Sequence, residues 1–261
     1  DTVLAGLQET GANILVEATS TNLSDAEPGL SHIVTALRMG VHVVTANKGP
    51  GALAGVELLA LARQQGVQLR MEASVMAGTP VLSTLIEGMA GANVQAVRGI
   101  LNGTTNYILS AMAEGRAYAE VLAEAQVLGY AETDPSADVE GYDALAKTLI
   151  LAALVFNQPL KQEQVALQGI TALSLDDIQQ AAEAGQRFKL IASIQRNGAQ
   201  LEARVAPQAL DLSDPLARVD GVTNALTIQT ETLPAVTIIG PGAGGLATAQ
   251  GLLADIIACA R

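Results

Sequence analysis

Cysteine is almost absent from this sequence. Only Cys259 is present among the 261 residues, which excludes an intrachain disulfide and suits a reducing compartment such as the cytoplasm. It lies in an apolar stretch near the end of the sequence, where we interpret it as a small buried hydrophobic residue. Because 49% of the residues are hydrophobic, a chain of this length can bury a core without disulfides or metal ions.

Basic residues and long apolar runs are also scarce. The sequence has 14 Lys and Arg against 26 Asp and Glu, a formal net charge of −12, and no basic cluster. Because proteins neutralise nucleic-acid phosphates with Lys and Arg, we expect no nucleic-acid partner. The longest apolar run, 149–156, is shorter than the ~18 residues that a membrane-spanning helix needs. We therefore expect no membrane span and, without a basic and apolar leader, no signal peptide.

The first part of the sequence alternates between strand and helix patterns. Buried strands are predicted at 13–18, 41–46 and 67–73, with helices at 27–39 and 53–65 between them. Apolar strands separated by helices are typical of a parallel sheet with helices on both faces. This predicts an α/β fold of Rossmann type, a doubly wound parallel sheet that binds dinucleotides.

One element of that fold is missing from the sequence. A dinucleotide-binding domain normally opens with a strand, a G-x-G-x-x-G turn and a helix, but no such turn precedes residue 50. The sequence also begins at Asp1 rather than Met. We therefore expect a truncated sheet that lacks its first strand–helix–strand unit, with residues 1–78 as the C-terminal part of the domain. Since that unit carries the residue that separates NAD from NADP, the preference between them stays open.

The pattern changes after residue 78. Helices are predicted at 80–89, 103–114, 118–128, 139–156 and 176–184, and strands at 94–101, 190–195, 201–206, 225–229 and 236–239. Helices and strands segregated in this way suggest an α+β domain over 79–240 for substrate binding and dimerisation. A glycine turn and an apolar helix at 246–260 follow, and we expect residues 241–261 to return to the nucleotide-binding domain.

The segment richest in candidate functional residues is 125–147, AQVLGYAETDPSADVEGYDALAK. Asp143 and Lys147 are four residues apart and share one face of a helix, whose start Asp138 can cap. This spacing equally fits an N-cap and a solvated ion pair. However, the helix continues without charge after Lys147 and so enters a core, where carboxylates are unfavourable unless they bind something.

A reaction that fits these residues is the reduction of an aldehyde by hydride. The reaction creates an alkoxide that needs a proton donor within hydrogen-bond reach. A partly desolvated lysine can donate and accept a proton near neutral pH, and carboxylates can hold a substrate ammonium group.

The segment resembles the signature of homoserine dehydrogenases, with its Ala, Gly, Asp-Pro, Asp, Gly, Asp and Lys in the same order. The resemblance extends over essentially the whole chain, through TANKGP at 45–50, EASVMAGTPVLSTL at 72–85, GILNGTTNYIL at 99–109 and GPGAGG at 240–245. It implies a homodimeric, NAD(P)-dependent homoserine dehydrogenase. Such an enzyme interconverts L-homoserine and L-aspartate 4-semialdehyde in the pathway to threonine, methionine and isoleucine.

The resemblance also implies roles for individual residues. Glu132 and Asp143 would hold homoserine with the help of Asp138, and Lys147 would be the proton donor and acceptor. Lys48 would contact both cofactor and substrate, and in some members of the family such a lysine takes part in proton transfer.

The remaining cofactor residues are expected at strand ends and in the glycine turn. Thr45 and Ala46 precede the lysine of the TANKGP loop, at the carboxyl end of a strand, where ligands bind in open α/β sheets. Thr19 and Ser20 end the earlier strand and would lie near the cofactor. Gly244 would face the cofactor, although close packing of a helix on a strand explains the glycine turn equally well.

The EASVMAGTP loop is similar to a stretch that binds a monovalent cation, Na⁺ or K⁺. The ligands would be backbone carbonyls, those of Glu72, Val75, Ala77 and Thr79. The alternative interpretation is a glycine-containing turn before a helix.

Two competing hypotheses come from different classes of protein. Another aspartate-family semialdehyde oxidoreductase, such as an aspartate-semialdehyde dehydrogenase, needs a cysteine nucleophile, whereas Cys259 stands alone in the terminal apolar helix. A non-catalytic ligand-binding homologue predicts loss of Lys147 or of the carboxylates, and all of them are present.

Overall fold

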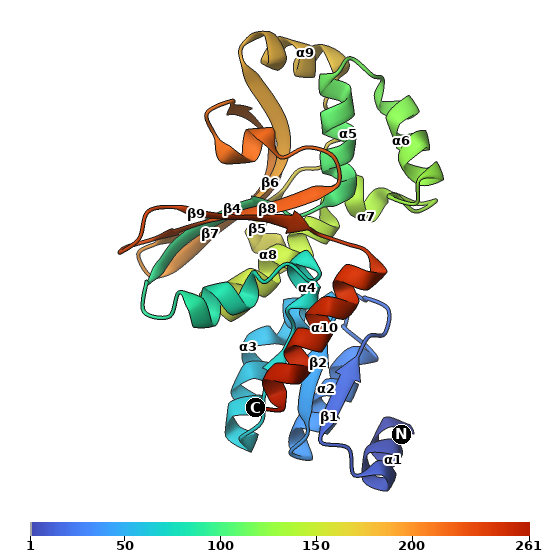
Figure 1. The fold of residues 1–261 in the computed structure, drawn as a ribbon, viewed down its shortest axis with the longest axis vertical. Coiled ribbons are helices and arrows are strands. Elements are labelled where there is room, and N and C mark those ends of the chain that lie inside the picture. The colour runs from blue at the N-terminus through green and yellow to red at the C-terminus, as the bar shows by residue number, and fades with distance from the viewer. Residues whose placement is uncertain (1) are drawn as a thin grey trace. The chain divides into compact units, whose positions relative to one another are not determined.

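The computed structural model describes residues 2–261, which form two compact units (Figure 1). Unit 1 contains the residues up to 90 together with 149–161 and 243–261, and unit 2 contains 91–148 and 162–242. The first boundary between the two units therefore lies after residue 90, whereas the sequence pattern places the domain boundary after residue 78. Residues 149–161, which the sequence assigns to the substrate domain, belong to unit 1.

Unit 1 is built on a parallel sheet of three strands, which confirms the predicted α/β class. The strands, in spatial order, are β1 (Ile14–Glu17), β2 (His42–Thr45) and β3 (Leu69–Arg70). The helices of the unit are α1 (Thr2–Thr10), α2 (Gly29–Arg38), α3 (Lys48–Gln65), α4 (Ala73–Met76), η1 (Thr84–Gly88) and α10 (Gly245–Cys259), together with the end of a helix that starts in unit 2. The last helix packs against β1, β2 and α4 (Figure 1) and so belongs to the unit that holds the parallel sheet.

The helix predicted at 53–65 is preceded by a short first helix and is separated from it by Ala54, whose φ of −140° and ψ of 22° are not helical. Both belong to α3, which begins at Lys48. Asn47 caps it, because its side-chain oxygen accepts a hydrogen bond from the backbone N–H of Gly49 at 3.0 Å. Pro50 fits in the first turn, where a helix needs no backbone donor. The helix ends at Gly66, whose φ of 68° is left-handed. The short first helix places Lys48 three residues after Thr45, the carboxyl end of β2.

The helix predicted at 80–89 has a different geometry in the structure. Its centre, η1 (Thr84–Gly88), is a π-helix, a form that often marks a functional or constrained segment. The carboxylate of Glu72 accepts three backbone N–H groups at the start of this segment, each at 2.8 Å. A buried side chain distant in sequence therefore caps the segment, which helical periodicity cannot reveal.

Unit 2 contains a six-stranded sheet with the order β5-β7-β6-β4-β8-β9, antiparallel except for the pair β5–β7. Its strands are β4 (Val94–Ile100), β5 (Val165–Leu167), β6 (Gln186–Asn197), β7 (Gln200–Asp211), β8 (Thr223–Thr230) and β9 (Val236–Pro241). Its helices are α5 (Gly103–Ala113), α6 (Tyr118–Val127), α7 (Ser136–Val139), η2 (Gln162–Gln164), α9 (Leu175–Glu183) and η3 (Pro215–Arg218). Helices α5 and α9 pack against β6, in the α+β arrangement that we expected.

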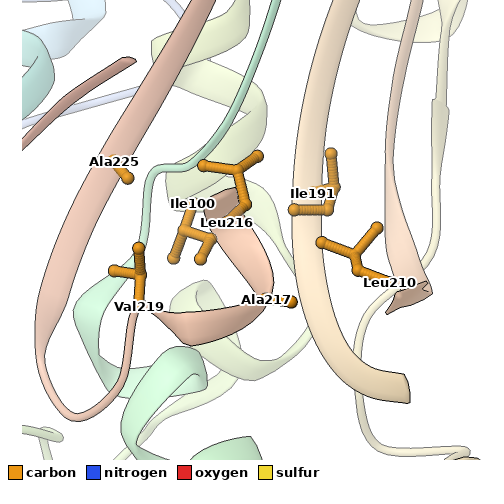
Figure 2. Packing of buried hydrophobic residues seen from close by; sticks show 7 residues of the cluster. All are labelled: Ile100, Ile191, Leu210, Leu216, Ala217, Val219 and Ala225. Carbon is orange, nitrogen blue, oxygen red and sulfur yellow. The ribbon is translucent and has the colours of Figure 1, made fainter. Parts of the chain in front are cut away.

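A cluster of buried apolar side chains fixes the end of β4. Figure 2 shows Ile100 of β4 among residues of β6, β7, β8 and the segment around η3. The members are Ile100, Ile191, Leu210, Leu216, Ala217, Val219 and Ala225. Full burial of one Leu or Ile side chain stabilises a fold by about 1.5–3 kcal/mol. This cluster therefore holds the chain firmly at the point where β4 leads into the candidate site.

The helix predicted at 139–156 is broken into two. Helix α7 ends at Val139, and α8 (Tyr142–Val155) begins after Gly141, whose φ of 91° favours glycine. Asp138 therefore lies inside α7 and does not cap α8, contrary to the prediction. Helix α8 starts in unit 2 and ends in unit 1. Across residues 2–261, no helix combines the length and apolar character of a membrane span.

Candidate functional site

Asp143 and Lys147, which the sequence predicts on one helix face, form a buried ion pair near the start of α8. The Nζ atom of Lys147 donates to Oδ2 of Asp143 at 2.7 Å and to the carbonyl oxygen of Leu101 at 2.6 Å. Lys147 is only 6% exposed. A buried ammonium needs such acceptors, because its transfer from water is otherwise strongly unfavourable. The structure thus excludes the alternative of a solvated ion pair.

Asn102 connects this pair to Asp138. Its Nδ2 donates to Oδ1 of Asp138 at 2.7 Å and to Oδ2 of Asp143 at 3.0 Å. Its Oδ1 accepts from the backbone N–H of Thr105 at 2.8 Å and so caps α5. In the sequence, the stretch Asn102-Gly103-Thr104-Thr105 offers N-capping side chains to the helix predicted at 103–114, and it indicates no further role for Asn102. Its place directly after a buried strand, within the GILNGTTNYIL motif, was the available signal for a further role.

The break at Gly141 is what allows both aspartates to reach Asn102. In a continuous helix, side chains five residues apart differ in direction by about 140°. Asp138 and Asp143 have this separation, yet both accept hydrogen bonds from the same amide nitrogen. The change of chain direction at Gly141 therefore brings the two carboxylates together.

The electrostatic environment of Asp138 differs from that of an exposed aspartate. Burial raises the pKa of this carboxyl above its ordinary value, and the hydrogen bond from Asn102 opposes that rise. The negative charge of Asp143 raises the pKa further, whereas the positive charge of Lys147 lowers it. Two carboxylates and one ammonium share a small volume, which suits the binding of a second positive group.

Glu132 stands apart from this cluster. It lies in an exposed loop, and among the described residues its carboxylate has no hydrogen bond or ion pair with Asp138, Asp143 or Lys147. The loop itself is held, because Nε2 of Gln126 donates to the carbonyl oxygen of Glu132 at 3.1 Å. The structure therefore brings together three of the four predicted substrate and catalytic residues of this segment.

The predicted cofactor residues gather at the carboxyl edge of the parallel sheet in unit 1. Strands β1 and β2 end side by side, and the backbone N–H of Ala46 donates to the carbonyl oxygen of Glu17 at 3.2 Å. The Nδ2 atom of Asn47 donates to Oγ1 of Thr19 at 3.2 Å and to the carbonyl oxygen of Ser20 at 3.4 Å. The loops after both strands are thus tied together beside the start of α3.

Glu17 is a residue of this edge that sequence reasoning missed. It is 2% exposed, and its carboxylate accepts from the backbone N–H of Thr19 at 2.8 Å and from the Thr19 hydroxyl. It also accepts from Oγ1 of Thr45 at 3.1 Å. The signal was a single acidic residue at the end of an otherwise apolar strand, followed by hydroxyl side chains. Its contacts fix Thr19 and Thr45, while Lys48 follows in the first turn of α3.

Gly244 lies where the glycine turn after β9 enters α10. It is the N-cap of that helix with φ 112° and ψ 139°, a conformation that L side chains rarely adopt. It is exposed, and a Cβ atom placed on it would meet nothing within 4 Å. The first predicted use of the glycine, an approach to a ligand, is therefore compatible with the geometry at this position.

The EASVMAGTP loop forms α4 and a turn that packs against α10. Ala77 has φ 49°, which turns its carbonyl away from the helical direction. The carbonyl oxygen of Thr79 accepts from the N–H of Val81 at 2.8 Å, and that of Glu72 accepts from Val75 at 3.5 Å. Within residues 2–261 there is no group of three or more His, Cys, Asp and Glu side chains that could hold a metal ion. A cation in this loop would therefore depend on carbonyl oxygens.

Comparisons with known proteins agree with one another. The family model described as homoserine dehydrogenase matches residues 80–257. The NAD(+)-dependent homoserine dehydrogenase of Pseudomonas canavaninivorans is 48% identical over 254 residues, which make up 97% of this chain and 72% of that protein. The chain spans less of three further curated homoserine dehydrogenases, 53%, 55% and 56% of their lengths.

Two solved structures extend the comparison to the fold. The crystal structure of a homoserine dehydrogenase from Thiobacillus denitrificans has a TM-score of 0.91 at 38% identity, with 98% of this chain and 58% of that chain covered. A hyperthermophilic archaeal homoserine dehydrogenase mutant in complex with NADPH has a TM-score of 0.85 at 34% identity, with coverages of 99% and 74%.

Proposed function

The chain belongs to the homoserine dehydrogenase family of oxidoreductases, and from that premise we propose that it interconverts L-homoserine and L-aspartate 4-semialdehyde. The observation that carries the proposal is the buried Asp143–Lys147 pair in the segment that matches the family signature. The reaction would serve the synthesis of threonine, methionine and isoleucine.

Lys147 is the proposed proton donor and acceptor. When the aldehyde is reduced, its oxygen becomes an alkoxide, which takes a proton from Nζ of Lys147; in the reverse direction Nζ receives the proton of the homoserine hydroxyl. The carboxylate of Asp143 and the carbonyl of Leu101 hold Nζ in place at 2.7 and 2.6 Å. The bound nicotinamide cofactor supplies or accepts the hydride.

The carboxylates are the proposed site for the substrate ammonium group. Asp143 and Asp138 converge on Asn102, and Glu132 would add a third carboxylate from its exposed loop. An ammonium ion is recognised by such oxygens through charge-assisted hydrogen bonds. This would account for two carboxylates, those of Asp138 and Asp143, in the neighbourhood of a single lysine.

The proposed cofactor is NAD or NADP. The residues that would hold it are those at the carboxyl edge of the parallel sheet and at the N-cap of α10, namely Thr19, Ser20, Thr45, Ala46, Lys48 and Gly244. One relative is NAD(+)-dependent and one similar structure is a complex with NADPH, so both cofactors need to be tested. Lys48 would contact the cofactor and the substrate.

A monovalent cation, Na⁺ or K⁺, would be bound by the carbonyl oxygens of Glu72, Val75, Ala77 and Thr79. The positive φ of Ala77 and the buried position of α4 support this proposal. Neutral carbonyl oxygens suit a hard cation of low charge. A rise in the thermal stability of the protein with K⁺ or Na⁺, but not with tetramethylammonium, would support the site.

We further propose a homodimer that is assembled through the sheet of unit 2. Strand β9 is an edge strand, and Ile239 on it is 55% exposed. A hollow of about 430 Å³ lies on the sheet, lined by residues of β4, β6, β7 and β8. An exposed edge strand offers unpaired backbone groups to which a second chain can pair. Light scattering that shows only monomer at micromolar concentration would contradict the dimer.

The proposed compartment is the cytoplasm, because the one cysteine of the sequence, Cys259, is a free thiol, as suits a reducing environment.

The same thiol has no role in the proposed chemistry. Cys259 is buried, and burial raises the pKa of its thiol above the ordinary value. A thiol of this kind is unreactive, since the thiolate is the reactive form. It therefore takes no part in the proposed chemistry, unlike the cysteine nucleophile of an aspartate-semialdehyde dehydrogenase.

The test of the proposed function is the oxidation of L-homoserine by the intact protein. Formation of reduced nicotinamide is followed by absorbance with NAD⁺ and, separately, with NADP⁺. We expect homoserine-dependent reduction of at least one cofactor, and none with L-serine, which lacks one methylene group. If homoserine binds but neither cofactor is reduced, the protein is a ligand-binding homologue and the proposal is wrong.

A further inference from the structure

The side chain of Asn102 is buried and fully engaged. It is 4% exposed, and its Oδ1 accepts from both the backbone N–H and the hydroxyl of Thr105, at 2.8 and 2.9 Å. Its Nδ2 donates to Asp138 at 2.7 Å and to Asp143 at 3.0 Å. One amide thus supplies an acceptor to α5 and two donors to the carboxylates of the proposed substrate site.

Capping alone does not require an asparagine at this position. An N-cap needs only an acceptor oxygen, and Asp and Ser cap helices as well as Asn does. Among short side chains, however, only the asparagine amide combines an acceptor with two donors. An aspartate would place a third negative charge beside Asp138 and Asp143. The two carboxylates therefore explain why the residue is an asparagine, and the need for a helix cap explains why a capping residue stands at position 102.

The neighbouring residue strengthens this arrangement. The carbonyl oxygen of Leu101 accepts a hydrogen bond from Nζ of Lys147. Asn102 donates to Oδ2 of Asp143, the same oxygen that accepts the hydrogen bond from Lys147. Two consecutive residues after β4 therefore hold both members of the ion pair. Because the apolar cluster of Figure 2 fixes the end of β4, the position of the pair is set by the core of unit 2.

We propose that Asn102 is a positioning residue for the reaction: it holds Asp138 and Asp143 at a fixed separation for the substrate ammonium and directs Asp143 toward Lys147. This inference rests on the proposed function. It predicts that the donors of Asn102 affect the binding of homoserine and the pH dependence of the reaction. A purely structural cap would affect only stability.

The first test is Asn102→Ser in the intact protein. Serine keeps a capping oxygen, carries no charge and cannot reach the two carboxylates. Loss of hydrogen bonds to charged groups should lower kcat/KM for homoserine by about tenfold or more. The KM for homoserine should rise, while the KM for the cofactor should stay near the wild-type value. Unchanged KM and kcat for homoserine in a folded Asn102→Ser protein would overturn the proposal.

The pH profile gives a second, independent result. Burial raises the pKa of Asp138 and the hydrogen bond from Asn102 lowers it, so removal of that bond should raise the pKa further. The acidic limb of kcat/KM should therefore move to higher pH in Asn102→Ser. The same shift should appear in a carboxyl titration by NMR without any substrate. That measurement decides the role of Asn102 even if the intact protein does not oxidise homoserine.

Two further variants separate capping from positioning. Asn102→Asp keeps the cap but has no donor, so its kcat/KM for homoserine should be as low as that of Asn102→Ser or lower. Wild-type kcat/KM in Asn102→Asp would refute the proposal, and this result is decisive even if Asn102→Ser fails to fold. Ser174→Ala is the matched control, because Ser174 caps α9 in the same unit through a capping box. It removes a helix cap and should therefore lower the melting temperature, while kcat/KM and the pH profile stay unchanged.

Discussion

The glycine between α7 and α8 gives a prediction that links backbone conformation to the proposed site. Gly141 has φ 91°, and a Cβ atom on it would lie 2.9 Å from Cδ1 of Leu167 and 3.4 Å from Cγ1 of Val205. Gly115 has almost the same φ, 92°, but a Cβ on it would meet nothing within 4 Å. The two glycines therefore form a matched pair in unit 2, with equal backbone strain and different surroundings.

The expected magnitudes follow from these surroundings. An L residue in a left-handed conformation is destabilised by about 1–2 kcal/mol, which applies to both Gly141→Ala and Gly115→Ala. The contact with Leu167 adds roughly 1 kcal/mol at Gly141, since a flexible side-chain end can move by a few tenths of an ångström. We expect total losses of about 2–3 kcal/mol for Gly141→Ala and about 1–2 kcal/mol for Gly115→Ala. The melting temperature should fall by roughly 5–10 °C and 3–6 °C, respectively.

The assay combines thermal unfolding with steady-state kinetics on the intact protein. Because Gly141 changes the direction of the chain between Asp138 and Asp143, Gly141→Ala should also lower kcat/KM for homoserine. Gly115→Ala should leave it unchanged. Equal melting temperatures for the two variants would refute the steric reasoning. Wild-type kcat/KM in Gly141→Ala would refute the conclusion that this break aligns the carboxylates.

Lys147→Ala should lower kcat by about 10²–10⁴ while cofactor binding, measured by fluorescence titration, stays near the wild-type level. Lys161→Ala, a lysine outside the site, should not change kcat; if Lys147→Ala kept more than about a third of kcat, Lys147 would not be the proton donor. Burial lowers the pKa of Lys189 below 10.5, so the folded state loses the proton of this side chain at a lower pH than the unfolded state does. The wild type should therefore gain stability relative to Lys189→Met as the pH rises from the pKa of the folded state towards 10.5. If urea titrations gave the same difference in unfolding free energy between the two proteins at neutral and at alkaline pH, this reasoning would be wrong. Gly251→Ala would place a Cβ atom 2.6 Å from the carbonyl oxygen of Ala77, so it should lower stability by about 1–3 kcal/mol in thermal unfolding, and an unchanged melting temperature would show that α10 can move away.

Elements with a clear hydrophobic period were predictable from the sequence. The three parallel strands, α2, α5, α6, α9 and α10 lie within a few residues of their expected positions. The predictions of secondary structure are wrong where the conformation depends on residues outside the local segment. The segment 139–156 reads as one helix because its apolar period continues, whereas the positive φ at Gly141 depends on tertiary packing. Similarly, the backbone N–H groups that precede η1 are bound by Glu72, which lies outside that segment.

The candidate site was predictable only where its residues share one segment. Asp143 and Lys147 are four apart on one helix, and that spacing is visible in the sequence. Asn102 lies 41 positions before Asp143, and its hydrogen bond to that residue depends on how β4 and α5 pack. Glu17 and Thr45 are 28 positions apart and meet because β1 and β2 are neighbours in the sheet. Strand order and helix packing therefore had to be known before these partners could be identified.

Helix α8 shows how the protein tolerates a buried ion pair. Asp143 lies in the first turn, where a negative charge interacts favourably with the helix dipole. Lys147 follows one turn later and is satisfied by Asp143 and Leu101. The next residues, from Leu149 to Ala153, are all buried and apolar. Their burial stabilises the folded chain and so offsets the desolvation of the charged pair. The hydrogen bonds to Asp143 and Leu101 thus hold the proposed proton donor in place, which a lysine on a solvated helix face would lack.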